Sequence, residues 1–138
     1  MKELVGVTFI LRLWAEPPSV AKYLFKCVRG MSKLGFQPYT ISLQNEPQHS
    51  DGSYPTMLLS VSQEAAVGVA LRRLLDNSRF SGVKIVGYDH NWNNAAMYPV
   101  QLMQQAGTVF TGAAFHCYEG AASQQLDVSY GTQGYQLV

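Results

Sequence analysis

The sequence has little cysteine, little charge and no long apolar run. Its two cysteines, Cys27 and Cys117, are too few for a disulfide framework, and no Cys-x-x-Cys pair indicates zinc. Charged residues make up 14% of the chain and the formal net charge is +1. No basic stripe or run of lysine and arginine stands out, which argues against nucleic acid as a partner. The longest apolar stretches are far shorter than a membrane span.

Motifs for phosphate chemistry and for serine hydrolysis are also missing, whereas material for a core is plentiful. There is no glycine-rich phosphate loop and no Gly-x-Ser-x-Gly elbow. The 138 residues are 47% hydrophobic, enough for one domain with a real core. Residues 1–18 faintly resemble a signal peptide, but Glu3 and Arg12 spoil its charge layout and no small-x-small cleavage site follows. We interpret this segment as part of the folded chain, or as a gene-model start, rather than as a secretion signal.

Helices and strands alternate along the remaining chain. Pro17 opens a helix that Gly35 ends, and a strand follows at 39–43. Ser60 and Gln63 form a capping-box pattern before a second helix with an apolar stripe. The later elements are a strand at 83–88, a helix at 98–106 and a strand at 109–115. Such alternation predicts an α/β protein with a parallel sheet built from βα units.

Each predicted strand runs into polar and aromatic residues. These clusters are Asn45-Glu46-Pro47, Asp89-His90-Asn91-Trp92 and His116-Cys117-Tyr118-Glu119. Ligands bind at the carboxyl ends of parallel strands in (β/α)₈ barrels and in doubly wound sheets alike, so the pattern leaves both folds open. A whole barrel needs roughly 250 residues. In either fold, we expect Glu46, Asp89 and His116 at the same edge of the sheet.

Glu46 is the sharpest candidate for chemistry. Glycoside hydrolysis needs a carboxylic acid that protonates the leaving oxygen and a second carboxylate across the sugar. The acid has to keep its proton near the working pH, which requires partial burial or a nearby negative charge. A strand end beneath aromatic side chains provides such a setting, and Pro47 biases Glu46 away from helical geometry. The alternative is a solvated loop glutamate.

The residues after the last predicted strand offer a second group of candidates. His116 and Tyr118 are two apart on an extended segment and therefore point to the same side, where they could bind sugar hydroxyls or a carboxylate. Phe115 and Cys117 should then point toward packing. The alternative for His116 is a structural histidine satisfied by the backbone.

Two weaker hypotheses use other side chains. Large aromatic residues could form platforms for a sugar face, or they could simply be core: Tyr54, Tyr88 and Trp92. Four side chains could be arranged as a metal site, although their spacings match no strong metal motif: His49, Asp51, Asp89 and His90.

Three linked segments, ISLQNEPQHS, KIVGYDHNW and AAFHCYEG, resemble the barrel of glycoside hydrolase family 30. The resemblance is closest to the fungal endo-β-1,6-glucanase branch, with glucosylceramidases as more distant relatives. It covers roughly residues 19–130, because the connecting segments YPTMLLSVSQEAAVGVALRRLL and YPVQLMQQAG are similar to that branch as well. It implies a partial (β/α)₈ TIM barrel, roughly strands four to six with their helices. Residues 1–138 would form one incomplete barrel domain, with 1–18 outside the match.

The resemblance also implies a role for particular residues. Glu46 would be the general acid/base of a retaining mechanism on a β-glucan, with β-1,6-glucan as the expected substrate, and a separate carboxylate would be the nucleophile. The other matched residues would bind substrate: Asn45 at the sugar's 2-hydroxyl, Asp89 and Trp92 along the donor subsite, and His116 and Tyr118 near the nucleophile.

The family's nucleophile is a glutamate in a Thr-Glu-Cys-like motif at the end of strand seven, and no such motif follows AAFHCYEG. We therefore expect no nucleophile in this chain. Two hypotheses stay open: a β-glucan endohydrolase represented by a part of its barrel, or a truncated, inactive product or sugar-binding remnant. A third is an unrelated α/β binding domain. The sequence predicts a β-glucan or glucoside substrate, no cofactor or metal, no protein partner, and, from the resemblance, an extracellular location without a convincing signal peptide.

Overall fold

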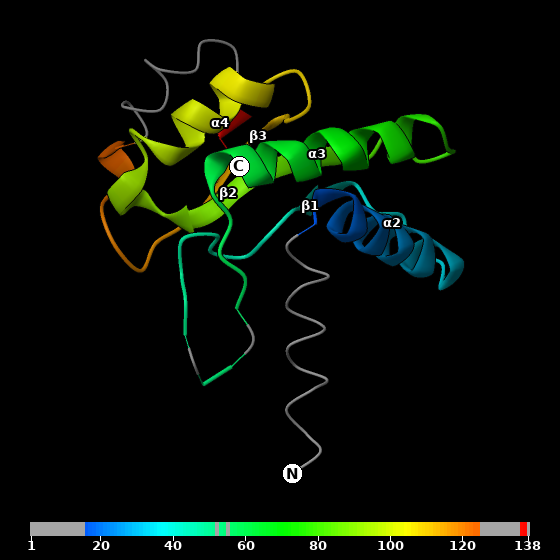
Figure 1. Ribbon diagram of the computed structural model, residues 1–138, viewed down its shortest axis with the longest axis horizontal. Helices are drawn as coiled ribbons and strands as arrows, with labels where there is room; N and C mark the ends of the chain where they lie inside the picture. The colour runs from blue at the N-terminus through cyan, green and yellow to red at the C-terminus, as the bar shows by residue number, and fades with distance from the viewer. Residues whose placement is uncertain (1–15, 52, 55, 125–135, 138) are drawn as a thin grey trace.

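Four parallel strands form one sheet in the order β1-β2-β3-β4 in the computed structural model, which describes residues 16–51, 53–54, 56–124 and 136–137 (Figure 1). The strands are β1 Thr40–Ser42, β2 Lys84–Asn91, β3 Gly112–His116 and β4 Gln136–Leu137. Each strand lies beside the next one in the chain, so the described sheet has no point at which strand order reverses. A doubly wound sheet has such a reversal, whereas a barrel has none. The predicted parallel α/β architecture is confirmed.

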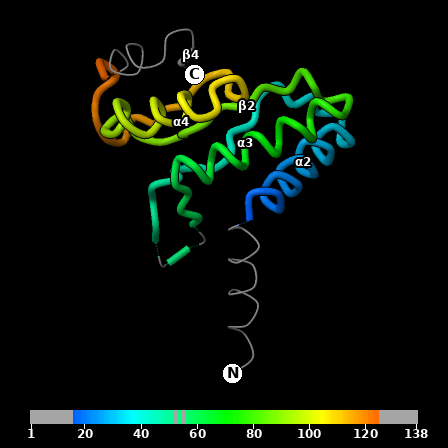
Figure 2. The backbone as a smooth tube through the Cα atoms, turned by 45° about the horizontal axis from the view of Figure 1, so that its top comes forward, coloured from blue at the N-terminus to red at the C-terminus, as the bar shows by residue number. Residues whose placement is uncertain are grey.

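Three helices pack beside one another along the sheet. They are α2 Pro17–Lys33, α3 Val61–Asp76 and α4 Tyr98–Ala106. Figures 1 and 2 show α3 in the middle, between α2 and α4. Parallel crossovers are right-handed, and here successive strands are neighbours, so the connecting helices α3 and α4 fall on the same face of the sheet.

The helix ends follow the predicted local signals. Proline occupies the first turn of α2, and Gly35 adopts a φ of 91° just after the helix ends. Ser60 caps α3: its hydroxyl accepts the Gln63 N–H, and the Gln63 side chain accepts the Ser60 N–H. These contacts satisfy backbone donors that a helix leaves free at its start.

The core lies between the helices and the sheet. Leu71 and Leu75 of α3, Ile85 of β2 and Leu102 of α4 are fully buried. Burying each such side chain contributes about 1.5–3 kcal/mol to stability. This layer fixes the sheet against α3, and with it the strand ends that carry the polar clusters.

Strand β2 is longer and less regular than predicted. It runs to Asn91, whereas the sequence indicated a strand at 83–88. Its register with β3 shifts between Gly87 and His90, so Tyr88 and Asp89 form a bulge. Both bulge residues have positive φ, 69° and 46°.

The two residues of β4 were missed by the sequence analysis. β4 pairs in parallel with β3, Gly112 opposite Gln136 and Ala113 opposite Leu137. A two-residue strand is too short to show a periodic pattern. The N-terminal segment predicted at 1–18 falls outside the described residues up to position 15.

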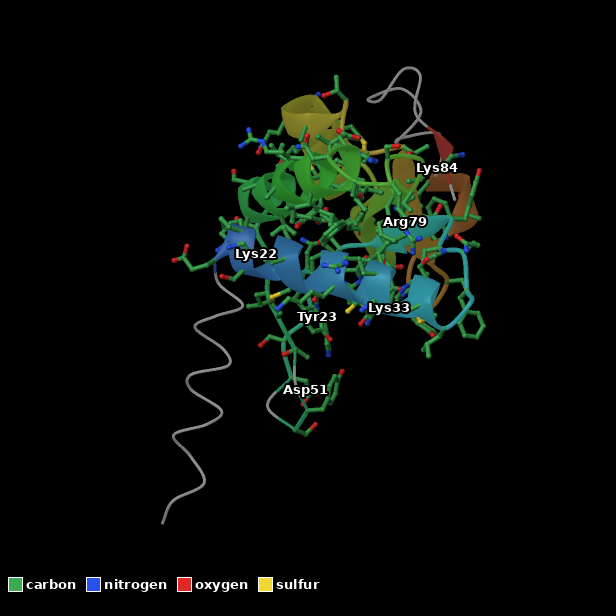
Figure 3. The ribbon with its side chains drawn as sticks, turned by 90° about the vertical axis from the view of Figure 1, so that its right-hand side faces the viewer. Lys22, Tyr23, Lys33, Asp51, Arg79 and Lys84 are labelled. Atoms are coloured by element: carbon green, nitrogen blue, oxygen red, sulfur yellow. The ribbon has the colours of Figure 1, made fainter. Side chains whose placement is uncertain are left out.

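Helix α2 carries an exposed basic stripe, which corrects the expectation that the chain has none. Its residues recur at intervals of four and three: Lys22, Lys26, Arg29 and Lys33. Figure 3 shows Lys22 and Lys33 toward the two ends of the helix. The stripe is invisible as a linear run because helical spacing separates its members. No helix in the described part of the chain has the length and apolarity that a bilayer span requires.

Candidate active site

The predicted residues Glu46, Asp89 and His116 meet at one edge of the sheet. Glu46 follows β1, Asp89 lies in the bulge of β2, and His116 ends β3. His116 Nδ1 is 3.0 Å from Glu46 Oε1, and His116 Nε2 is 3.2 Å from Asp89 Oδ1. The side chains are 18–21% exposed, so each is mostly shielded while still reachable from solvent. The imidazole thus bridges two carboxyl groups from neighbouring strands.

Backbone contacts hold Glu46 in place. Its N–H donates to the Asp89 carbonyl at 2.9 Å, and its own carbonyl accepts the His49 N–H at 2.9 Å. Glu46 has a φ of 52°, so it avoids the right-handed helix as expected but adopts the left-handed region. Pro47 behind it is fully buried. The chain therefore presents the Glu46 carboxyl to the cleft in a fixed, strained conformation.

The proton count of this group suits acid–base chemistry. Each of the two His116 contacts joins a ring nitrogen to a carboxyl oxygen, and each needs one proton to be a hydrogen bond. Two protons are therefore shared among the imidazole and two carboxyls. One arrangement has a doubly protonated His116 between two carboxylates, and the other a neutral ring beside one protonated carboxyl. Both arrangements place a hydrogen-bonding proton between His116 and Glu46.

His90 is a further neighbour of Glu46. Its Nδ1 lies 3.9 Å from Glu46 Oε1, and Asn91 Nδ2 lies 3.5 Å from the same ring nitrogen. Burial lowers the pKa of His90, an effect that the Glu46 charge opposes and His116 reinforces. The environment thus favours the neutral ring, which can accept a hydrogen bond at Nδ1.

A polar cleft of about 630 Å³ opens at Glu46. Its lining residues are Glu46, Gln48, His49, His90, Asn91, Asn93, Asn94, Tyr118 and Glu119. Amide and imidazole groups are the side chains that hydrogen-bond hydroxyl-rich ligands. The cleft therefore has the size of a small-ligand site, and its lining is more polar than that of most such sites.

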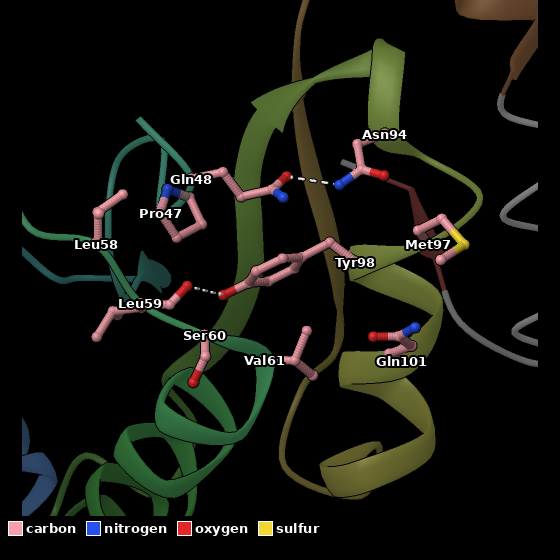
Figure 4. A pocket seen from close by; sticks show the side chains of 10 residues that line it. All are labelled: Pro47, Gln48, Leu58, Leu59, Ser60, Val61, Asn94, Met97, Tyr98 and Gln101. Carbon is pink, nitrogen blue, oxygen red and sulfur yellow. Dashed lines mark hydrogen bonds between the residues drawn. The ribbon is translucent and has the colours of Figure 1, made fainter. Parts of the chain in front are cut away.

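A second, more apolar cavity of about 500 Å³ lies next to this cleft (Figure 4). Gln48 and Asn94 line both, and their side chains are joined by a hydrogen bond of 2.9 Å. On the apolar side, the buried Tyr98 hydroxyl donates to the Leu59 carbonyl at 2.9 Å. The Gln48–Asn94 pair thus lies between the polar cleft and the apolar cavity.

The other predicted site residues are placed differently. Tyr118 is 80% exposed at the cleft and packs edge-on against His116, with ring centroids 5.6 Å apart. Trp92 is half-buried and stacks on Phe115 at 3.9 Å, outside the cleft lining. Asn45 is exposed beside Glu46, and its carbonyl accepts the Gln44 side chain.

Several weaker expectations are corrected. Tyr88 is fully buried and is a core residue rather than a sugar platform. Cys117 is exposed and does not point toward packing, because β3 has already ended at His116. Asp51 accepts hydrogen bonds from the Ser53 N–H and hydroxyl, which lower its pKa and keep it in its own loop. Among the described residues, no three His, Cys, Asp or Glu side chains are arranged to hold a metal.

Two buried polar residues at the site were not predicted. Asn91 Oδ1 accepts the N–H groups of Tyr118 and Glu119, at 3.0 and 3.2 Å, and so fixes the segment after β3. Glu64 of α3 accepts the Tyr88 N–H at 2.9 Å directly beneath the bulge. The only sequence signal for Glu64 is a carboxylate among apolar residues near a helix start, which normally indicates a helix-dipole effect.

The chain is similar in sequence to three fungal endo-1,6-β-D-glucanases. It is 33% identical over 103 residues to neg1 of Aspergillus fumigatus, 33% over 99 residues to BGN16.3 of Trichoderma harzianum, and 32% over 104 residues to the enzyme of Neurospora crassa. Each match covers 71% of this chain and 20% of the relative. The chain therefore spans about a fifth of the length of these relatives. No protein-family model matches it.

Solved structures with a similar fold include the endo-β1,6-glucanase BT3312, with a TM-score of 0.78 and 24% identity over 88% of this chain and 28% of that one. SrfJ from Salmonella typhimurium has a TM-score of 0.76 and 23% identity, over 85% and 27%. These likenesses concern the fold. Together with the sequence relatives they confirm the resemblance that the three motifs predicted: the chain is a relative of the glycoside hydrolases named endo-β-1,6-glucanases.

Proposed function

We propose that this chain carries the acid/base half of a retaining β-1,6-glucan hydrolase site of glycoside hydrolase family 30, with Glu46 as the proton donor. One observation supports this most: a strained Glu46 faces a polar cleft with its carboxyl bonded to His116, which is bonded in turn to Asp89. The substrate class comes from the relatives, which are named for 1,6-β-D-glucan.

In this proposal Glu46 works twice. It first gives its proton to the glycosidic oxygen of the leaving sugar, while a nucleophilic carboxylate attacks the anomeric carbon. It then takes a proton from the water that hydrolyses the glycosyl–enzyme intermediate. His116, whose Nδ1 lies 3.0 Å from Glu46 Oε1, would hold that carboxyl in the same orientation in both steps.

The remaining matched residues would bind the sugar. Asn45 precedes Glu46 and would reach the 2-hydroxyl, and Asp89 would contact the donor sugar, whereas Trp92 stacks on Phe115 outside the cleft lining. His116 and Tyr118 would lie near the nucleophile. Tyr118 is 80% exposed, so a sugar ring has free access to it.

The resemblance gives no carboxyl among the described residues the role of nucleophile. It makes Asp89, which contacts His116, a substrate ligand, and it assigns no such role to Glu119, which accepts a hydrogen bond of 2.6 Å from Asn93. A retaining site needs a second carboxyl about 5–5.5 Å from the acid/base. We therefore propose that the 138-residue chain alone does not hydrolyse glucan, and that it corresponds to strands four to six of an extracellular barrel enzyme, with residues 1–18 outside the match.

A chimaera tests this proposal. The matching segment of the Trichoderma harzianum glucanase is replaced by that of this chain, and release of reducing sugar from β-1,6-glucan is measured. We expect turnover by the chimaera and none by the chain alone. Glu46→Gln should lower kcat of the chimaera by about 10²–10⁴-fold, the usual contribution of general acid–base catalysis.

Asp76→Asn is the matched control, because it makes the same carboxyl-to-amide change on a side chain that is 56% exposed at the end of α3. It should leave turnover unchanged. A chimaera that folds but is indifferent to Glu46→Gln would refute the assignment. Glucan binding by the chain without turnover in the chimaera would favour a sugar-binding remnant.

A further inference from the structure

Glu64 is a carboxyl side chain buried without a cation. It lies in the first turn of α3 with no exposed surface, and no ion pair to it exists among the described residues. Glutamate is almost never fully buried unless it is paired, because removing its charge from water is costly. An apolar residue would fill the same space at a lower desolvation cost. The presence of a carboxyl here therefore needs an explanation.

The reason lies in what Glu64 Oε1 holds. It accepts the N–H of Tyr88 at 2.9 Å. Tyr88 belongs to the β2 bulge, where the register with β3 shifts and the regular ladder is interrupted. A bulge leaves a backbone group without its strand partner, and a buried N–H needs an acceptor. Glu64 supplies that acceptor from the neighbouring helix.

The bulge in turn sets the acid/base. Asp89, the residue after Tyr88, accepts the Glu46 N–H through its carbonyl at 2.9 Å. Its carboxylate lies 3.2 Å from His116 Nε2, and His116 Nδ1 lies 3.0 Å from Glu46 Oε1. Both the backbone and the side chain of Glu46 are therefore positioned through Asp89.

Gly87 gives Glu64 the room to make this contact. A Cβ at position 87 would lie 3.1 Å from Glu64 Oε1 and 2.4 Å from Leu102 Cδ2. Only a residue without a side chain lets the helix carboxyl approach the strand backbone so closely. The glycine and the buried glutamate thus form one local arrangement.

The second oxygen of Glu64 makes no hydrogen bond among the described residues. The Tyr98 hydroxyl interacts with the carboxyl, but its single proton is donated to the Leu59 carbonyl (Figure 4). A proton on Glu64 Oε2 would remove the buried charge and leave Oε1 free to accept from Tyr88. The contact with the Tyr88 N–H thus depends on the length of the side chain and the position of its acceptor oxygen, and not on its charge.

We propose that Glu64 is a positioning residue for Glu46: it holds the Tyr88–Asp89 bulge, and the bulge fixes the acid/base and His116. The inference rests on the proposed role of Glu46 in catalysis. Its geometric content, however, can be measured without any hydrolysis.

The test is amide hydrogen exchange in the 138-residue chain, measured residue by residue. The first variant, Glu64→Gln, keeps the length of the side chain and an acceptor oxygen but cannot carry a charge. The second, Glu64→Asp, keeps the carboxyl group but shortens the side chain, so that its oxygen no longer reaches the Tyr88 N–H. Glu64→Asp should accelerate exchange at Tyr88 and Glu46 by about ten-fold relative to α3, the effect of losing one hydrogen bond. Glu64→Gln should retain the wild-type pattern.

Val67→Ala is the control, because Val67 is buried on the same helix without a described hydrogen bond to the bulge. It should accelerate exchange at Tyr88, Glu46 and the rest of the core to the same degree. Uniform acceleration by Glu64→Asp as well would overturn the proposal and leave Glu64 a general stabilising residue. Unprotected Tyr88 and Glu46 amides in the wild-type chain would also overturn it.

The chimaeric glucanase provides a second readout. Glu64→Asp should lower kcat by about ten-fold or more while KM changes little, because a small misplacement of a catalytic group costs rate. The variant Glu64→Gln should retain most of the kcat of the parent chimaera. Equal losses of kcat in both variants would contradict the proposal. An inactive parent chimaera would count against the proposed function alone, since the exchange result is independent of turnover.

Discussion

At the scale of single residues, backbone strain concentrates at the candidate site. The non-glycine residues with positive φ in the described chain are Glu46, Tyr88 and Asp89. Each such conformation costs of order 1–3 kcal/mol and persists only when surrounding contacts impose it. Here the contacts are the Glu46 N–H to the Asp89 carbonyl and the Tyr88 N–H to Glu64. The strained backbone therefore marks the place where tertiary contacts impose a fixed geometry at a local energetic cost.

Glu64 should make stability depend on pH. Burial raises its pKa from 4.5 to about 7, partly opposed by the Tyr88 N–H and the Tyr98 hydroxyl and aided by the charge of Asp89. The folded chain thus holds this proton more tightly than the unfolded chain. Between about pH 4.5 and pH 7 the free energy of unfolding should fall as pH rises, by on the order of 3 kcal/mol from this group.

Urea unfolding at several pH values measures this effect. Glu64→Gln cannot ionise, so its free energy of unfolding should lose this decline between pH 4.5 and pH 7. Asp76→Asn, at an exposed position, should keep the wild-type slope. Parallel slopes in wild type and Glu64→Gln would show that Glu64 ionises normally in the folded chain.

At the scale of elements, helices could be predicted well because their signals are local. The prolines in the first turn of α2, the Ser60–Gln63 box and the glycine after α2 act on neighbouring backbone groups, and all three lie where the sequence indicated. The bulge of β2 could not be predicted. Left-handed Tyr88 and Asp89 are unfavourable locally, and they exist because Glu64, some 24 positions earlier, provides an acceptor.

The segment after β3 gives a prediction about one glycine. Gly120 has a φ of 80°, and a Cβ there would lie 2.6 Å from Asn93 N and 2.8 Å from Trp92 C, both backbone atoms. Gly120→Ala should therefore destabilise the chain by about 1–3 kcal/mol and displace the neighbouring cleft residue Glu119.

Gly82→Ala is the matched control, because a Cβ at position 82 meets nothing within 4 Å. It should be neutral or should stabilise by up to about 1 kcal/mol. The midpoints of urea unfolding for the two variants provide the comparison. Equal midpoints would mean that the Gly120 turn adapts to a side chain without cost.

At the scale of the whole molecule, the sequence predicted which strand ends meet but not what supports them. Glu46, Asp89 and His116 could be brought together from chain order alone, since parallel strands share their carboxyl edge. Trp92 was expected along the cleft, but stacking on Phe115 decides its position. The roles of Asn91 and Glu64 were not predicted, because their partners are backbone groups of other segments, which no pattern in the sequence reveals.

The far edge of the sheet gives the last prediction. Within the described residues β1 pairs with β2 alone, and Leu34, Phe36 and Tyr39 beside it are 75%, 60% and 69% exposed. An unpaired strand edge bordered by apolar side chains is a template for pairing with another chain.

We expect the purified chain to associate as its concentration rises, as measured by light scattering after size exclusion. The double variant Leu34→Lys, Phe36→Lys should shift the chain toward monomer without loss of helical signal, because both side chains are already exposed. A wild-type chain that stays monomeric at all concentrations and melts in one sharp transition would contradict this expectation.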